Sequence, residues 1–496
     1  MMGRFFVLLI LAFAFLSPFA RSAPGLTFEV KSKNGSLLPC RVLVVDGKGK
    51  PHHPEAALFW KGGFVCEGKA ELDLESGVYR YEIERGPEWK PVTGEVELKT
   101  DSMPIRVTLE RLVDLKKEGW YSGDLHVHRA PNEMPLHMTS EDLSVASVLT
   151  WWNKRNAWGD ALIPKNPVKE IDGRFYHILG GEDERGGGAL LYHRMNQTID
   201  ITKAEREWPA SVTFLHQAKK AGAWAEIEKP FWWDTPVWLA TGKVSSVGLA
   251  HNHMQRLGVL GSEAWGRARD EKRYPGVHGN GLYTQDLYYK ILNAGLRLPP
   301  SAGSASGVLG NPVGYNRVYV HTGSTLDWDS WWEGLGKGRS FVTNGPLLRL
   351  RANGTLSGEI LKGAETVTIK LEGKIDSNTP IDRIELVRSG VVQKIELPYE
   401  FSIETSGWFL VRAITTAQET FRFASTAPWY IEIGGAPMKP DRDAASFFLK
   451  WTRERRVRAL ATLKDETKRK EVASTYDEAI AYWDGKERDW SPHIAP

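Results

Sequence analysis

The 496-residue chain has little of several features that would point to one class of protein. Its formal net charge is only +3, which gives no reason to expect nucleic acid or an acidic membrane as a partner. It has two cysteines, Cys40 and Cys66, and the sequence leaves a disulfide and two buried thiols equally open. There is no internal repeat, no phosphate-binding glycine loop and no Gly-x-Ser-x-Gly nucleophile motif. These absences remove nucleic-acid binding, phosphate-loop chemistry and serine-elbow chemistry from the candidate functions.

Long hydrophobic runs are also absent, except for one at the N-terminus. There, Arg4 precedes an apolar run from Phe5 to Leu16, Pro18 breaks the run, and small residues follow. This order is typical of a secretory signal peptide, which we place at residues 1–23. The run is shorter than the roughly 20 apolar residues of a stable membrane span, although a short N-terminal anchor is an alternative. We therefore expect a secreted or periplasmic protein with no stable membrane anchor after signal cleavage.

The rest of the chain changes its pattern three times, which predicts a multidomain protein with α/β and all-β parts. Residues 26–112 alternate apolar and polar side chains between turn signals, as in a β-sandwich. Residues 113–345 alternate short apolar runs with helical patterns, one of which is expected to begin at Thr139, and this indicates a parallel sheet. Residues 346–436 return to strands and predict a second sandwich. Residues 440–485 carry an apolar stripe, which predicts a helix or a helix pair packed on the body.

Tryptophan is abundant, with 20 residues, and several stand in pairs. The pairs are Trp151-Trp152, Trp232-Trp233 and Trp331-Trp332. Exposed indoles suit sugar rings, but large domains also bury tryptophan, and we expect most of these residues in the core.

The sharpest chemical motif lies near the start of the α/β region, in the stretch from Gly123 to His128. Because alternate side chains of a strand share a face, Asp124, His126 and His128 should point together. Two imidazoles and a carboxylate suit a divalent transition metal. The alternative is an ordinary strand with three polar residues on its outer face. The position of the motif, where ligands collect at the carboxyl ends of parallel strands, favours the metal.

The stretch from Gly119 to His128 resembles the first motif of PHP-domain metallohydrolases, and the stretch from Gly338 to Pro346 resembles the end of their barrel. The similarity is strongest to the exported, carbaryl-hydrolase-like branch, in which a β-sandwich precedes the barrel. This resemblance implies a distorted (β/α)7 barrel over residues 113–345. It also implies one to three metal ions and the hydrolysis of phosphoesters, esters or related bonds.

Carried over position by position, the resemblance implies that His126 and His128 are metal ligands. It adds Glu182 as a bridging carboxylate and His253, or His251 in its place, as a later histidine. Other family ligands have no counterpart here: the chain has Trp151-Trp152 for Asp-His, Lys229-Pro230 for His-Pro, and Ala305-Ser306-Gly307 for Asp-x-His. Too few ligands remain for three metals, so we expect one divalent ion, either zinc, manganese or iron.

Four charged residues are the catalytic candidates, namely Asp124, Glu228, Lys229 and Arg185. Asp124 could orient a ligand histidine or act as a base. Glu226 and Glu228 share a strand face, so one of them could replace a lost ligand; alternatively, Glu228-Lys229 is a solvated strand end. Arg185 could bind an anionic group of a substrate, or it could pair structurally with a neighbour.

Two functions are compatible with these residues. The first is a secreted PHP-type hydrolase with a single-metal site, acting on an ester, phosphoester or related bond of a small-molecule or glycan-like substrate. The second is a catalytically inactive PHP-like barrel that binds a glycan or another cell-envelope ligand. A purely structural role is the third possibility.

Overall fold

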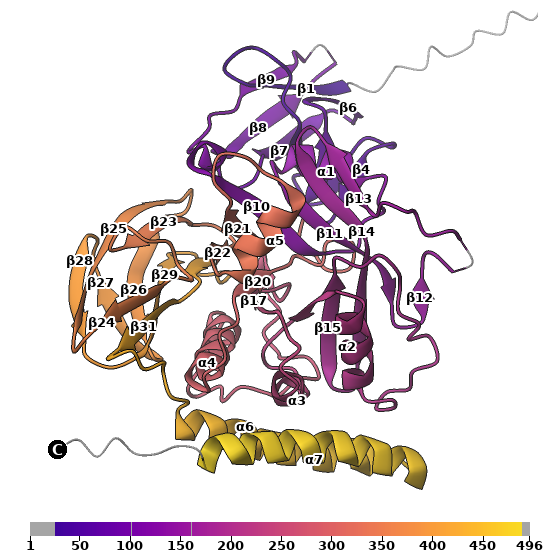
Figure 1. Ribbon diagram of the computed structural model, residues 1–496. Coiled ribbons are helices and arrows are strands. Elements are labelled where there is room, and N and C mark those ends of the chain that lie inside the picture. The colour runs from indigo at the N-terminus through magenta and orange to yellow at the C-terminus, as the bar shows by residue number, and fades with distance from the viewer. Residues whose placement is uncertain (1–24, 101, 160, 489–496) are drawn as a thin grey trace, which may run out of the picture.

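Strands dominate the computed structural model, which describes residues 25–100, 102–159 and 161–488 (Figure 1). The protein is a mixed α/β chain with seven α-helices among these residues. Within the same ranges, none of the helices combines the length and the apolar character that a membrane span needs. The predicted signal peptide, residues 1–23, lies outside the described residues.

The N-terminal strands form two small sheets around one core. Leu26, Phe28 and Val30 of β1 are buried, whereas the residues between them are partly exposed, as the alternation in the sequence predicted. The sheets have the orders β6-β1-β9 and β4-β5-β2-β7-β8, with β3 beside β2. Cys40 and Cys66 face each other across β2 and β5 as buried thiols whose sulfur atoms lie 3.8 Å apart. The strands are β1 (Gly25–Lys31), β2 (Cys40–Asp46), β3 (Pro51–His52), β4 (Leu58–Trp60), β5 (Gly63–Cys66), β6 (Lys69–Asp73), β7 (Gly77–Glu84), β8 (Val92–Leu98) and β9 (Ile105–Thr108).

The central strands combine parallel and antiparallel pairing and begin with β10, which carries Asp124 and His126 of the predicted metal motif. Strands β10, β11 and β14 are parallel neighbours, and β16, β17 and β20 form a second parallel run. Strand β15 joins the two runs by antiparallel pairing with β14 and β16. Val127 in β10 forms a parallel bridge with Ser306 beyond β20, so the two outer strands of this set approach each other. The strands are β10 (Trp120–Val127), β11 (Val145–Trp152), β12 (Arg155–Asn156), β13 (Val168–Ile171), β14 (Arg174–Arg185), β15 (Gly188–His193), β16 (Trp224–Ile227), β17 (Ser246–Ala250), β18 (Met254–Gln255), β19 (Gly258–Val259), β20 (Pro300–Ala302), β21 (Arg317–His321) and β22 (Ser340–Thr343).

Short helices connect and cover these strands: α2 contacts β16, α4 contacts β17, and α5 contacts β21. The expected helix start at Thr139 is wrong, because α1 ends at Ser140. The Thr139 hydroxyl donates back to the carbonyls of Pro135 and Leu136, and the Glu141 carboxylate accepts from Arg41 at 2.7 Å. The elements are η1 (Leu115–Glu118), α1 (Met134–Ser140), α2 (Ser211–Lys220), α3 (Thr235–Ala240), α4 (Gly279–Asn293) and α5 (Trp328–Gly336).

The C-terminal strands continue the central sheet, because β22 pairs with β30. A separate three-stranded sheet has the order β23-β25-β28. Leu348, Ile369, Phe409 and Trp429 belong to the apolar core of this part of the chain. The strands are β23 (Leu347–Ala352), β24 (Ile360–Gly363), β25 (Val367–Asp376), β26 (Ile381–Arg388), β27 (Val391–Ile395), β28 (Tyr399–Ile403), β29 (Gly407–Thr415), β30 (Phe423–Thr426) and β31 (Trp429–Ile433).

Two long helices, α6 (Arg442–Thr462) and α7 (Glu466–Arg488), lie together beneath α3 and α4 in Figure 1. Tyr476 and Trp483, which belong to the apolar stripe noted in the sequence, are buried. Arg455 of α6 bonds Asp234 at 2.7 Å, and Tyr476 donates to the same carboxylate at 2.9 Å. The helix pair is therefore fixed to the central part by polar as well as apolar contacts.

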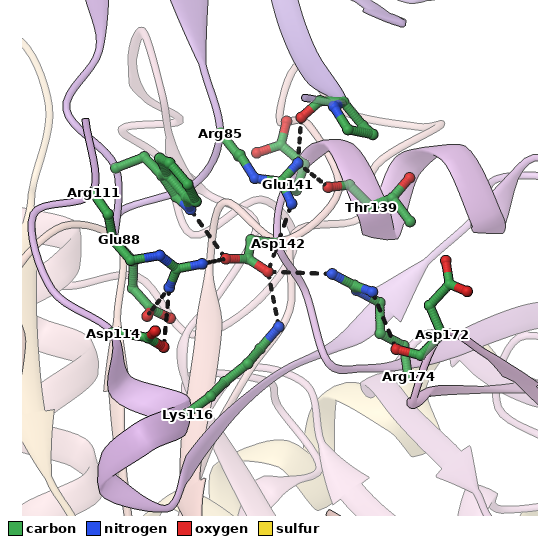
Figure 2. A network of polar contacts seen from close by, with 12 residues as sticks. Arg85, Glu88, Arg111, Asp114, Lys116, Thr139, Glu141, Asp142, Asp172 and Arg174 are labelled. Atoms are coloured by element: carbon green, nitrogen blue, oxygen red, sulfur yellow. Dashed lines mark hydrogen bonds and ion pairs between the residues drawn. The ribbon is translucent and has the colours of Figure 1, made fainter. Parts of the chain in front are cut away.

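A cluster of buried charges joins the N-terminal strands to the central part, with Asp142 at its middle (Figure 2). One oxygen of Asp142 accepts from Lys116 at 2.8 Å and from Arg174 at 3.3 Å. The other accepts from Trp89 at 3.0 Å and from Arg111 at 2.7 Å. Burial would raise the pKa of Asp142, but the surrounding cations hold it well below its usual value. Asp142 is therefore ionised and accepts hydrogen bonds from four side chains.

Candidate metal centre

The cluster of His126, His128 and Glu182 is the group of metal-ligand side chains that the described residues bring together. The Nε2 atoms of the two histidines lie 3.0 Å apart. Oε2 of Glu182 lies 3.6 Å from His126 Nε2 and 3.3 Å from His128 Nε2. His126 and Glu182 are buried, and the His128 side chain is 10% exposed, so the cluster opens on the His128 side.

Local sequence explains why the two imidazoles meet. Leu125 and Val127 are fully buried behind the strand, which turns His126 and His128 to the opposite face. The loop after β20 packs closely over them, since a Cβ atom at Gly303 would lie 2.3 Å from that of His126. Ala305 in this loop has a φ of 50°, and its amide donates to the His126 carbonyl at 2.7 Å. This loop thus supports the histidine pair.

The charged groups of the cluster shift the pKa values of one another. Burial disfavours the charged form of His126, but the carboxylates of Glu182 and Glu228 overcome this effect and raise its pKa to about 10. Burial likewise opposes ionisation of Glu182, yet His126 and His128 lower its pKa to about 2.

Glu228 and Lys229 are not a solvated strand end, because both are buried. The Lys229 ammonium lies 2.5 Å from Glu228 Oε1, and Glu228 Oε1 lies 3.4 Å from His126 Nδ1. The Trp232 indole donates to the other Glu228 oxygen at 2.9 Å. Glu228 therefore contacts the nitrogen of His126 that points away from the cluster, where a carboxylate fixes the orientation of a ligand imidazole. Glu226 is buried as well; it accepts from Ser246 at 3.2 Å and lies 3.8 Å from His193.

The side chains of Asp124 and Arg185 make hydrogen bonds to other parts of the protein. Asp124 accepts backbone hydrogen bonds at 3.0 Å from His126, at 3.0 Å from Ser304 and at 2.7 Å from Gly314. It therefore ties β10 to the later loop rather than holding an imidazole ring. Arg185 donates to both oxygens of Asp183 and to the Pro209 carbonyl. This arrangement corresponds to the structural pairing that the sequence left open for Arg185.

His251 and His253 lie outside the three-residue cluster, so the four-ligand set expected from the sequence is not assembled. Nε2 of His251 pairs with the Thr284 hydroxyl at 2.9 Å, and its Nδ1 accepts from the His253 amide at 3.3 Å. Nδ1 of His253 donates to the Ser262 carbonyl at 3.1 Å. Burial, together with the nearby Lys229 ammonium, lowers the pKa of His253 to about 3.

Trp151 and Trp152 lie on opposite faces of β11, and Trp152 borders the cluster. Trp151 packs so tightly on β14 that a Cβ atom at Gly181 would lie 1.7 Å from the indole. The Trp152 ring lies 5.0 Å from the His128 ring, and its nitrogen donates to Glu184 at 2.9 Å. Sequence reasoning did not single out Glu184, although it shares the strand face of Glu182 by the same alternation. Burial and the charges of Glu182 and Glu228 raise its pKa to about 8.

The three ligand atoms fit one divalent ion. Ligands about 2.1 Å from a tetrahedral ion lie about 3.4 Å from each other, close to the 3.0–3.6 Å separations found here. Oε2 of Glu182 is buried and has no hydrogen-bond partner, although it points at both imidazoles. A buried carboxylate oxygen without a donor is costly, and a cation would satisfy it.

Comparison with known proteins adds no identification: no family model, no curated protein and no solved structure matches this chain. What the site can do therefore has to be argued from its own residues.

Proposed function

We propose that this chain is an exported, metal-dependent hydrolase of the PHP type that holds one divalent ion and acts on an ester, phosphoester or related bond. The observation that carries this proposal is the buried triad of His126, His128 and Glu182, with its unpartnered carboxylate oxygen. On this proposal, strands β10 to β20 are the distorted (β/α)7 barrel, and β1–β9 and β23–β31 are the two sandwiches. Two histidines and one glutamate form a known ligand set of catalytic zinc sites, which keep a position open for water or substrate.

The residues around the triad have different roles in this proposal. A bound zinc, manganese or iron ion would polarise the bond under attack and increase the acidity of water. Glu228 holds the His126 ring through Nδ1, so that Nε2 faces the ligand position. Lys229 keeps an ammonium group beside Glu228 inside the buried site, where it balances a carboxylate and attracts an anionic group of a substrate. Trp152 covers His128 and limits the access of water from that side.

A second candidate is a barrel of the same kind that binds its ligand without catalysis. The observation that favours it is the filling of the neighbouring space by Trp152 and Lys229, where the resemblance places metal ligands. The metal content of the protein separates the two candidates.

The deciding experiment is metal analysis by mass spectrometry on the folded protein and on the double variant His126→Ala/His128→Ala. We expect about one equivalent of zinc, manganese or iron in the wild type and none in the variant, because two of three ligands are lost. The matched control is His52→Ala/His53→Ala, which removes two histidines from the N-terminal part of the chain. This variant should keep the metal content of the wild type.

Metal-loaded wild type is then assayed on carboxylic ester, phosphomonoester and phosphodiester substrates, with the double variant as the blank. Turnover of any of these substrates that disappears in the variant supports the hydrolase. Stoichiometric metal without turnover on all three classes would favour the binding barrel, and failure to take up metal after reconstitution would overturn the single-metal site.

A further inference from the structure

An open cleft of about 490 Å³ lies at the end of β14, the strand that carries Glu182. Its lining residues are Glu184, Arg185, Gly186, Arg206 and Trp265. Glu184 links the cleft to the triad, because it follows Glu182 by two residues on the same face of β14. A volume of this size is within the usual range for small-molecule sites, so the cleft can accept part of a substrate.

Trp265 is the unusual member of this lining. It is 46% exposed, more than any other tryptophan among the described residues. One face of its indole packs on Trp232, with ring centroids 5.1 Å apart and planes at 28°. Trp232 in turn bonds Glu228, so the exposed indole is held in a fixed relation to the site.

The backbone before Trp265 is also unusual. Ala264 has a φ of 49°, a left-handed conformation that is costly for a residue with a Cβ atom. Such a conformation persists where the surrounding structure requires it, and here it precedes an indole with a free face at the mouth of the cleft. The exposed face of this indole is an apolar surface on which a ligand can pack.

Polar groups stand at the rim of the cleft beside the indole. The Arg206 side chain is 71% exposed, and its nearest charged partner is Glu207, at 3.7 Å. Glu184 accepts one hydrogen bond, from Trp152, and has a second oxygen for a ligand. Arg185 does not offer its guanidinium to a ligand, because this group is bound to Asp183 and to backbone carbonyls.

From this arrangement we infer that the cleft binds a carbohydrate, with one sugar ring stacked on Trp265 and its hydroxyls bonded to Glu184 and Arg206. A sugar ring has an apolar face for the indole and polar edges for the carboxyl and guanidinium groups. A flat aromatic ligand would cover the same indole but would desolvate both polar groups without bonding them, which is costly. The inference deepens the proposed hydrolase, since it names a saccharide as the part of the substrate that does not react.

The test is isothermal titration calorimetry on the full chain with hexasaccharides of glucose, xylose and N-acetylglucosamine, each in metal-free and metal-loaded protein. At least one saccharide should bind in both forms, because the stacking residue is not a metal ligand. Trp265→Ala should weaken this binding about tenfold or more, and Trp265→Phe, which keeps a ring, by less than about threefold. Val391→Ala, an exposed apolar residue on β27, is the matched control and should not change the affinity.

The outcomes separate this inference from the proposed hydrolase. Saccharide binding that survives in the His126→Ala/His128→Ala variant, while turnover is absent even in the wild type, supports the carbohydrate cleft and counts against the hydrolase. Turnover without binding of any of the saccharides overturns the carbohydrate cleft alone. Equal affinity in Trp265→Ala and wild type, or binding of p-nitrophenol in place of every saccharide, also overturns it.

Discussion

Asp142 and Glu182 are both buried carboxylates surrounded by positive or protonatable side chains, but they differ in what satisfies them. Asp142 accepts hydrogen bonds from four side chains, which include Lys116 and Arg111 (Figure 2). One oxygen of Glu182 accepts none, although two imidazole nitrogens lie within 3.6 Å of it.

This difference separates a structural charge from a functional one. A carboxylate that accepts hydrogen bonds from four side chains is already stabilised within the protein. Its network holds two parts of the fold together. A carboxylate oxygen that lies near two imidazole nitrogens but accepts no hydrogen bond is arranged like a metal ligand. The comparison can be tested, because the two sites should respond in opposite ways to loss of charge.

The largest effect is expected for Asp142→Ala. Removal of the carboxylate leaves Lys116, Arg111 and Arg174 with buried or half-buried charges that lose their common partner, and loss of one partner from a buried ion network costs about 3–5 kcal/mol. Urea unfolding of the metal-free protein measures this loss. The control Asp73→Ala, at an exposed position of β6, should change the free energy of unfolding by less than about 0.5 kcal/mol. Similar stability of Asp142→Ala and wild type would contradict a structural role.

A smaller loss of stability is expected for Glu182→Gln, about 1–2 kcal/mol, because an imidazole can release its proton when its carboxylate partner is removed, whereas a guanidinium cannot. The same variant should lose at least tenfold in metal affinity, since one of three ligands is replaced by a neutral amide. Unfolding in the presence of a chelator gives the first quantity, and metal titration gives the second. If Asp142→Ala took up metal as poorly as Glu182→Gln while still folded, the distinction between the two carboxylates would fail.

Much of this arrangement could be predicted from local patterns. Period-two alternation predicted that Leu26, Phe28 and Val30 would be buried in a strand, and it placed His126 and His128 on one face. The same rule also links Glu182 and Glu184, and applying it to the whole of that stretch would have found Glu184. Where the relevant contacts lie within one strand, the sequence carries enough information.

The rest depends on partners that are remote in the chain. Asp124 lies on the expected strand, but its oxygens accept from the amides of Ser304 and Gly314, and no local pattern indicates contacts over that separation. His251 directly follows the parallel strand β17, where ligands collect, yet its Nε2 is hydrogen-bonded to the Thr284 hydroxyl of α4. Side chains that meet only through tertiary packing decide which candidate residues join the site.

A pH-dependent effect is expected at Glu88, which borders the Asp142 network. Burial, with the Asp142 carboxylate nearby, raises the pKa of Glu88 to about 7 in the folded state, above its ordinary value of 4.5. Between pH 4.5 and pH 7 the unfolded chain therefore releases a proton that the folded chain retains. The contribution of Glu88 to stability is complete below pH 4.5 and is lost as the pH rises through 7, by up to about 1.4 kcal/mol per pH unit. Glu88→Gln has no such proton, so the free energy of unfolding of wild type relative to this variant should fall between pH 5 and pH 7. Urea unfolding of both proteins at the two pH values measures this difference, and a constant difference would show that Glu88 is ionised like Asp142.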